Sequence, residues 1–137
     1  MISRIQKAKE SEGFTLIELL VVMIIIGILA AIAIPLFLSQ REKAEDSAAK
    51  ADVSTLGKEI ATYYVDNNGV PTMGGGGGSP YTLNGETIGN SSDNVTIVSA
   101  GTDIVDSTDW CVAVYNPKGD KQTFSYSNTD GLAEGGC

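Results

Sequence analysis

The sequence predicts an α+β fold in which a long N-terminal helix is followed by a small antiparallel sheet. Three observations carry this prediction. No charged side chain occurs from Leu19 to Leu38, a helical pattern continues to about residue 67, and the last third of the chain alternates as β-strands do. The second half of the helix has one apolar stripe. Because a sheet needs its apolar face covered, we expect the C-terminal half of the helix to pack on it.

The chain begins with a short polar leader, residues 1–13, followed by an apolar segment, residues 14–38. The leader carries Arg4, Lys7 and Lys9 against two glutamates, and the segment is long enough to span a bilayer as a helix. A secretory signal peptide is cut after its apolar region, whereas this region runs directly into a charged stretch. We therefore expect the apolar segment to stay in the mature protein, with the basic leader in the cytoplasm. A plain single-pass anchor fits the same composition.

Glu18 is the one charged residue of the apolar segment. An isolated charge in a membrane costs on the order of a few kcal/mol, and no other side chain of the segment can neutralise it. Its partner is therefore expected outside the segment, either elsewhere in the chain or on another chain, which indicates assembly rather than catalysis. Capping of an ordinary anchor helix by Glu18 is the alternative.

Two residues weaken the helix within the apolar segment, Gly27 and Pro35. Proline removes an amide donor and clashes with the carbonyl group four residues before it. A kink or local unwinding is therefore expected between Gly27 and Pro35.

Residues 39–67 continue the helix in amphipathic form. Apolar side chains recur there every three or four residues and form a single stripe: Ala49, Val53, Leu56, Ile60 and Tyr63 or Tyr64. Most of the remaining surface of this helix is expected to carry charged residues: Arg41, Glu42, Lys43, Glu45, Asp46, Lys50, Asp52 and Lys58. Gly57 weakens it by about 1 kcal/mol relative to alanine. An Asn-Gly pair with a proline close behind predicts the end of the helix near Asn67.

Residues 72–80 contain five consecutive glycines, Gly74 to Gly78. This composition is typical of a flexible linker without defined structure of its own. A phosphate-binding loop is the alternative, but the Gly-Lys-Ser/Thr ending of such loops and the strand before them are missing here.

Residues 81–137 switch to strand patterns. Residues 95–98 are mostly β-branched, 110–115 place Trp110, Val112 and Val114 on one face, and 123–127 alternate. Proline and glycine between the last two segments are placed for a turn. We expect these two segments to form an antiparallel hairpin within a sheet of three or four strands.

The composition of the chain disfavours nucleic-acid binding and metal binding. The net charge is −8 overall and the leader contributes +1, so residues 14–137 carry −9. This disfavours direct nucleic-acid binding by a lone subunit, because such binding neutralises phosphates. The chain has no histidine and two cysteines, Cys111 and Cys137, for which a disulfide is expected in an oxidising compartment. Two thiols alone do not make a zinc site, so no cofactor or metal is expected.

The segment Gly13-Phe14-Thr15-Leu16-Ile17-Glu18, followed by Leu-Leu-Val-Val-Met-Ile, resembles the N-terminus of type IV pilins and pseudopilins. The similarity is strongest over residues 13–38, weaker through Tyr64, and limited to the general plan beyond. It implies the pilin fold, with residues 39–137 as a globular head on the helical spine.

The resemblance implies a processing pathway. A membrane-embedded prepilin peptidase would cut between Gly13 and Phe14 and remove the leader. Phe14 would become the N-terminus and be methylated on its amine, and Glu18 would neutralise the Phe14 amine of a neighbouring subunit during assembly. Gly27 and Pro35 would bound a part of the helix that melts in the packed filament.

The resemblance also implies a disulfide loop between Cys111 and Cys137, a feature of many major pilins. The implied partners are copies of the same chain in a helical homopolymer, the peptidase, the pilus assembly machinery and membrane lipid before assembly. The precursor would lie in the cytoplasmic membrane as a single-pass protein and the product in a pilus on the cell surface.

Three functions follow for comparison. The first is a pilin whose filament serves adhesion, twitching motility or DNA uptake. The second is a pseudopilin that forms a short piston in a type II secretion or competence system. The third, a membrane-tethered enzyme, is disfavoured because no histidine base or placed carboxylate pair is present.

Asp103, Asp106 and Asp109 lie at intervals of three and are expected to be solvated surface, although some pseudopilins bind calcium near their C-terminus.

Overall fold

The structure is a computed structural model that describes residues 13–98 and 103–137 of the chain. Most of the predicted leader, residues 1–12, therefore lies outside the described residues. The chain divides into two compact units, one up to Leu38 and one from Ser39 to Cys137. The second unit is called the head below.

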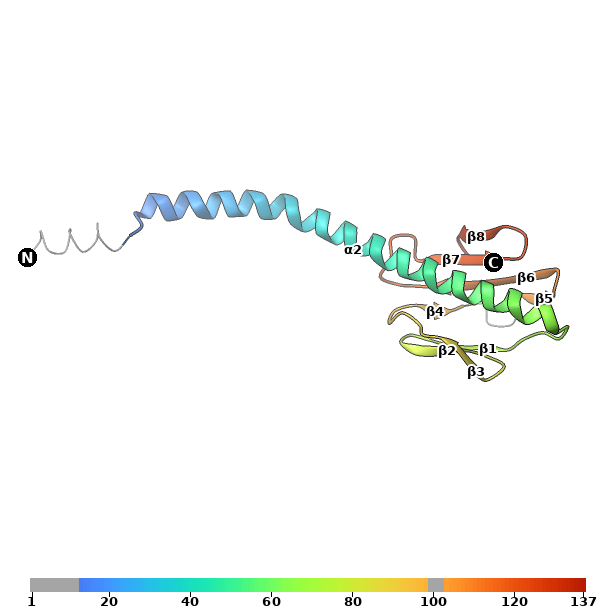
Figure 1. Cartoon of the computed structure of the whole chain (residues 1–137). Coiled ribbons are helices and arrows are strands. Elements are labelled where there is room, and N and C mark those ends of the chain that lie inside the picture. The colour runs from blue at the N-terminus through green and yellow to red at the C-terminus, as the bar shows by residue number, and fades with distance from the viewer. Residues whose placement is uncertain (1–12, 99–102) are drawn as a thin grey trace, which may run out of the picture. The chain divides into compact units, whose positions relative to one another are not determined.

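One helix, α2 (Leu16–Asp66), contributes to both units (Figure 1). Its 51 residues end where the Asn-Gly pair predicts. The main-chain N–H and the side-chain amide of Asn67 both donate to the carbonyl oxygen of Tyr63, at 3.1 and 3.0 Å. These two bonds satisfy a carbonyl group that the end of a helix otherwise leaves without a partner.

An antiparallel sheet follows the helix, so the α+β prediction is confirmed. Its strands are β1 (Met73–Gly76), β2 (Ser79–Leu83), β3 (Glu86–Gly89), β4 (Thr96–Ile97), β5 (Ile104–Asp106), β6 (Asp109–Tyr115), β7 (Thr123–Ser127) and β8 (Gly131–Glu134). Their order is β3-β2-β1-β4-β6-β7-β8, with β5 paired to β6. The predicted hairpin of β6 and β7 is confirmed, with Val114 opposite Phe124. The expected size of three or four strands is wrong, because the described residues form eight.

The glycine-rich stretch accounts for much of this difference. Residues 72–80, expected as an unstructured linker, form β1, a tight turn and the start of β2. Gly75 adopts a φ of 92°, and a methyl group there would overlap the carbonyl oxygen of Pro80. Only glycine combines that backbone angle with so close an approach of two strands. The glycines therefore build a hairpin here instead of a flexible tether.

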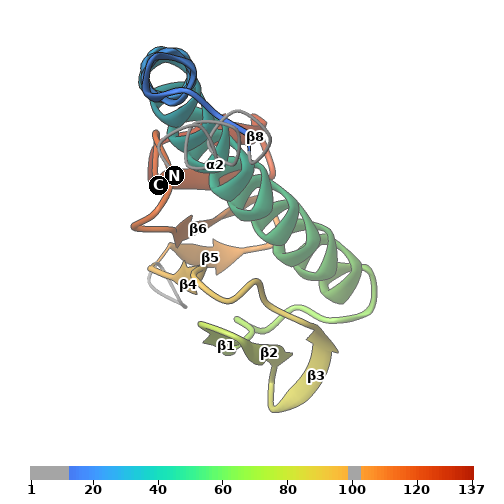
Figure 2. The ribbon, with the colours of Figure 1, turned by 90° about the vertical axis from the view of Figure 1, so that its left-hand side faces the viewer.

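The core of the head lies between the helix and one face of the sheet. Ala49, Val53, Leu56 and Ile60 are fully buried, which confirms the predicted stripe. Tyr64 continues it by packing against the core. The sheet and the loop before β4 contribute the rest of the core: Met73, Tyr81, Val95, Ile104, Trp110, Val112, Val114 and Phe124. Figure 2 shows the head part of α2 lying against the sheet.

Two acidic residues of the helix are buried, contrary to the expectation that they belong to the charged surface. Asp46 accepts hydrogen bonds from the main-chain N–H groups of Lys121 and Gln122, at 3.0 and 3.2 Å. Asp52 accepts from the Tyr81 hydroxyl at 2.8 Å and from the main-chain N–H and hydroxyl of Ser92 at 2.8 and 2.9 Å. Buried carboxylates need such partners. Both side chains therefore fasten loops of the sheet to the helix.

Glu45, a third acidic residue of the helix, also binds segments of the sheet side of the head. Its carboxylate accepts from the side-chain amide of Asn116 at 2.8 Å and from that of Asn94 at 3.4 Å. The hydrogen bond from Asn116 holds the pKa of Glu45 below its ordinary value, since it favours the charged form. One face of the helix thus carries acceptors for the 91–94 segment and for the β6–β7 loop.

The C-terminus is tied to the sheet by a disulfide. Cys111 of β6 is bonded to Cys137, as expected, and their Cα atoms are 5.9 Å apart. The final strand, β8, is also paired along its length with β7. In the chain-entropy account such a crosslink stabilises a head of this kind by about 2–4 kcal/mol.

Gly57 weakens the helix but is required for packing against the sheet. A methyl group at this position would overlap the ring of Tyr126, which in turn stacks on Trp110 with 6.2 Å between ring centroids. We expect Gly57→Ala to lower the free energy of unfolding, because forced overpacking costs about 1–3 kcal/mol against a helix-propensity gain of about 1 kcal/mol. Thermal unfolding of the detergent-solubilised full chain, followed by fluorescence of the single tryptophan, measures this effect.

The matched control is Gly27→Ala, the same substitution in the same helix. A methyl group at Gly27 would meet no described atom within 4 Å apart from the neighbouring residues and backbone of its own helix. Gly27→Ala is therefore expected to leave the unfolding midpoint of the head unchanged. An equal or higher midpoint for Gly57→Ala would show that the Tyr126 ring moves aside at no cost.

Candidate assembly site

The N-terminal unit exposes apolar side chains on all sides of its helix. Every large hydrophobic side chain from Phe14 to Leu38 is exposed, from 47% for Val21 to 86% for Leu16. Among the described residues, α2 is the one helix long and apolar enough to cross a membrane. An apolar surface of this extent requires a cover of lipid or of other protein.

Glu18 forms a reciprocal cap with Thr15 at the start of this helix. The Glu18 carboxylate oxygen Oε2 accepts from the main-chain N–H of Thr15 at 2.9 Å, and Thr15 Oγ1 accepts from the main-chain N–H of Glu18 at 3.3 Å. This arrangement is a capping box, in which a threonine and a glutamate three residues later satisfy two otherwise unpaired donors. The capping alternative raised from the sequence is therefore present in the structure.

The cap also determines where the charge lies. The N–H group that Glu18 accepts from belongs to the residue directly after Phe14. Only Oε2 takes part, and no described donor contacts Oε1. A carboxylate can accept several hydrogen bonds through its two oxygens. Glu18 can therefore cap its own helix and still accept a bond from another chain.

The predicted cleavage position lies just before the helix. Gly13 and Phe14 are outside α2, and Phe14 is 83% exposed. Gly13 has a φ of 121°, a backbone angle that L side chains rarely adopt. The bond between these residues is therefore in accessible, non-helical backbone.

The helix continues through both of its predicted weak points in a single subunit. Gly27 and Pro35 both lie inside α2, which is helical throughout, so the isolated chain is not unwound between them. Pro35 still removes one backbone donor from the helix, and membrane helices tolerate this. Melting of this part in a packed filament stays a prediction.

The three aspartates at intervals of three do not converge. The Asp106 carboxylate accepts from the main-chain N–H groups of Thr108 and Asp109 and from the Thr108 hydroxyl, at 2.7–3.0 Å. The two bonds from Thr108 hold its pKa below the ordinary value. Within residues 13–98 and 103–137, no group of three acidic or thiol ligands is placed to hold a metal ion.

The structure thus places Gly13, Phe14 and Glu18 together at one end of the apolar unit, and Cys111 with Cys137 in the head. Sequence reasoning missed Thr15. The signal for it is the Thr-x-x-Glu spacing immediately before an apolar run, which is typical of a capping box.

Comparison with known proteins assigns the same N-terminal region. Residues 9–34 match the family described as the prokaryotic N-terminal methylation motif. The chain is 42% identical over 67 residues to a type II secretion system core protein G of Aeromonas hydrophila. This alignment covers 49% of this chain and 46% of that protein. This chain therefore matches less than half of the length of that relative.

A longer match joins the chain to a pilus component. The chain is 39% identical over 92 residues to the type IV narrow pilus major component PilA5 of Thermus thermophilus. This alignment covers 65% of this chain and 78% of that protein. The chain is also 45% identical over 60 residues to the wide pilus major component PilA4 of the same organism, over 44% of this chain and 46% of the relative. No solved structure matches the chain.

Proposed function

The chain belongs to the family of type IV pilins and pseudopilins, and on this premise we propose that it is the subunit of a type IV pilus. The observation that carries the choice of a pilus is the match to the narrow pilus component, which covers 78% of that relative. An alignment of that length extends beyond the apolar unit into the head. The Cys111–Cys137 disulfide agrees with the loop that many major pilins carry.

The proposal includes processing of the precursor. A prepilin peptidase cuts the exposed bond between Gly13 and Phe14, and the new Phe14 amine is methylated. The apolar unit then holds the subunit in the membrane until assembly. In the filament, copies of the same unit cover one another's apolar side chains, which are exposed in the single chain.

The proposal also includes an ion pair between chains. After cleavage, the Phe14 amine is a cation in apolar surroundings, and a buried charge is costly unless it is paired. The Glu18 carboxylate of a neighbour supplies the partner, since Oε1 is open while Oε2 caps the helix. The capping box holds the carboxylate in place before the amine arrives, which lowers the entropy lost on pairing.

A pseudopilin of a secretion system is the second candidate. The matches to core protein G favour it, because such proteins of several bacteria are 36–42% identical to this chain over 64–67 residues. Such a subunit would form a short fibre within the cell envelope. For either candidate we propose a structural role without catalysis or a cofactor.

Electron microscopy of cells that produce the chain separates the two candidates. Antibodies against the head, coupled to gold, should decorate fibres that extend well beyond the cell surface if the chain is a pilin. Labelled short fibres confined to the envelope would decide for the secretion role. The absence of any labelled fibre, with the chain present in the membrane, would contradict both.

A further inference from the structure

The head contains two Asn-Gly pairs, Asn68-Gly69 and Asn84-Gly85. In such a pair the main-chain nitrogen of the glycine can attack the side-chain carbonyl carbon of the asparagine, because glycine has no side chain to hinder the approach. The attack requires a backbone that can bring these two atoms together. Since the two pairs share the same dipeptide, their different surroundings in the fold decide which of them reacts.

Asn68-Gly69 lies in the connection between α2 and β1. Both residues are exposed and lie outside the helix and the strands. Among the residues that the structure describes, neither the Asn68 side chain nor the main-chain N–H of Gly69 forms a hydrogen bond. Exposed backbone without hydrogen bonds changes conformation at little cost in free energy. The attacking nitrogen and the carbonyl carbon of this pair can therefore meet in the folded head.

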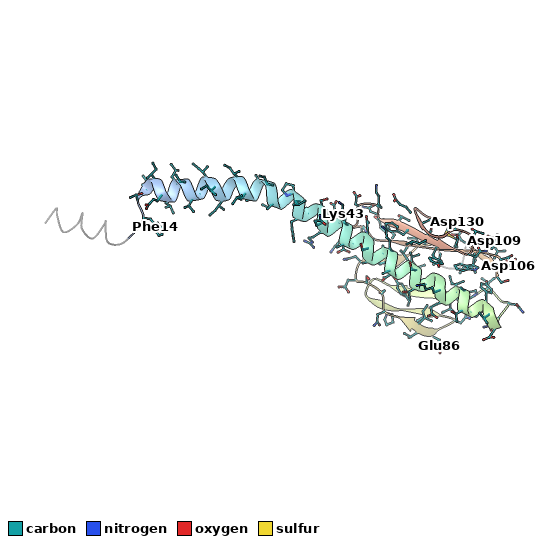
Figure 3. All side chains as sticks on the ribbon, turned by 45° about the horizontal axis from the view of Figure 1, so that its top comes forward. Phe14, Lys43, Glu86, Asp106, Asp109 and Asp130 are labelled. Carbon is teal, nitrogen blue, oxygen red and sulfur yellow. A yellow bond between two sulfur atoms is a disulfide. The ribbon has the colours of Figure 1, made fainter. Side chains whose placement is uncertain are left out.

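Asn84-Gly85 is just as exposed but is held in one conformation. It forms the turn between β2 and β3, with φ of 52° and 84°. The Asn84 side-chain oxygen accepts from the main-chain N–H of Thr72 at 2.8 Å, and the Asn84 main-chain N–H donates to the Thr72 carbonyl oxygen at 2.7 Å. Figure 3 shows Glu86, the next residue, at the outer margin of the head. Hydrogen bonding, not burial, therefore restrains this pair, and both bonds must break before it can react.

We propose that Asn68 is a site of spontaneous covalent modification and that Asn84 is protected from the same reaction. The Gly69 nitrogen forms a bond to Cγ of Asn68 and loses its proton, while the side-chain amide group takes up a proton and leaves as ammonia. Water then opens the resulting succinimide ring. Opening at Cγ gives aspartate, and opening at the main-chain carbonyl gives isoaspartate, in which the chain continues through the former side chain. Water is the only co-reactant.

Both products alter the end of α2. The new carboxylate lies two residues after Asp66, where the helix dipole disfavours negative charge, and no basic residue of the last helical turn offsets it. Isoaspartate also adds one carbon to the main chain between two fixed points. These are Asn67, which donates to the Tyr63 carbonyl oxygen, and the fully buried Pro71. We therefore expect the modification to loosen the connection between the helix and β1, whether or not the chain forms filaments.

Ageing of the folded, detergent-solubilised full chain tests the proposal. The chain is kept in mildly alkaline buffer below its unfolding midpoint, and peptide mass spectrometry follows the conversion of each pair. Labelling by an isoaspartyl methyltransferase identifies the isoaspartate product. We expect Asn68 to convert at least about tenfold faster than Asn84, which corresponds to about 1.4 kcal/mol in activation free energy. In chain unfolded with guanidinium chloride the two rates should become similar, because the restraints on Asn84 are then lost.

Gly69→Ala is the matched control variant. Gly69 has no positive φ, and a methyl group there would lie 3.5 Å from the Tyr63 hydroxyl, which is an ordinary contact. The variant should therefore fold normally, while the added side chain hinders the attack and lowers the conversion of Asn68 by about tenfold or more.

Limited proteolysis measures the loosening. The aged chain should be cut between α2 and β1 faster than a fresh Asn68→Asp variant, which carries the new charge without the longer main chain. Equal conversion of Asn68 and Asn84 in the folded chain, or no conversion of Asn68 there, would overturn the modification proposal. A rate difference that persists in the unfolded chain would show that the neighbouring sequence, and not the fold, protects Asn84. Equal cutting of fresh and aged chains would contradict the loosening.

Discussion

Glu18→Gln is expected to reduce filament yield more than tenfold while the subunit still enters the membrane. Glutamine is accepted at this position of a capping box, so the helix keeps its cap and loses only the negative charge. The Phe14 amine of the neighbouring subunit is then left without a counter-ion. Removing one partner of a buried ion pair costs about 3–5 kcal/mol, and each ~1.4 kcal/mol is a factor of ten in an equilibrium constant. Immunoblots of sheared and cell-bound fractions measure the yield.

Thr15→Ala is the reciprocal variant. It removes the hydroxyl that accepts from the Glu18 amide and keeps the carboxylate. Loss of such a cap costs about 1 kcal/mol, so we expect filaments at a yield within about threefold of the unchanged chain. The opposite pattern, normal filaments for the Glu18→Gln variant and none for Thr15→Ala, would show that Glu18 acts only as a cap.

Asp52→Ala is expected to destabilise the head by about 2–5 kcal/mol, because a buried donor and a half-buried donor lose their acceptor. These donors are the hydroxyl of the fully buried Tyr81 and the main-chain N–H of Ser92. A buried donor left unpaired costs about 1–3 kcal/mol. Because these bonds fasten the β1–β2 hairpin and the 91–94 segment to α2, their loss should loosen that side of the head. Chemical unfolding of the detergent-solubilised chain measures the change.

Two controls separate the buried carboxylate from its neighbourhood. Asp93→Ala removes an exposed acidic residue of the same segment and should change stability by less than about 0.5 kcal/mol, as most surface substitutions do. Tyr81→Phe removes one of the bonds to Asp52 and should have an intermediate effect. Equal stability of the Asp52→Ala and Asp93→Ala variants would contradict the fastening role.

Local patterns predict the fold where one element determines its own conformation. The stripe from Ala49 to Ile60 follows from periodicity, the β6–β7 hairpin follows from alternation and turn residues, and both are present in the structure. The sheet is larger than expected because glycine composition does not distinguish a linker from a tight hairpin. Asn84-Gly85, between β2 and β3, has positive φ at both residues. This dipeptide is a strong hairpin signal. It identifies β2 and β3, which the sequence analysis above did not predict.

The buried acceptors of the helix could not be predicted in the same way. Asp46 and Asp52 are charged residues on an otherwise charged face, and periodicity assigns them to solvent. Their burial depends on loops that lie 40 to 76 residues away in the chain. A single sequence contains no local signal for such a contact, because the partners are distant in the chain and several of them are main-chain N–H groups, which every residue except proline has.

The candidate assembly site rests mainly on the sequence. Gly13, Phe14 and Glu18 are recognisable from their order before an uncharged apolar run. Thr15 completes the site through a standard capping spacing.

The mass of the subunit in filaments sheared from cells tests the central claim most directly. The claim is that the chain is cut at Gly13, methylated at Phe14 and then polymerised through its apolar unit. Mass spectrometry of the filament protein should therefore show a chain that begins at N-methylated Phe14 and contains the Cys111–Cys137 disulfide. Filaments built from chains that retain residues 1–13 would contradict it, because the Phe14 amine would not exist to pair with Glu18.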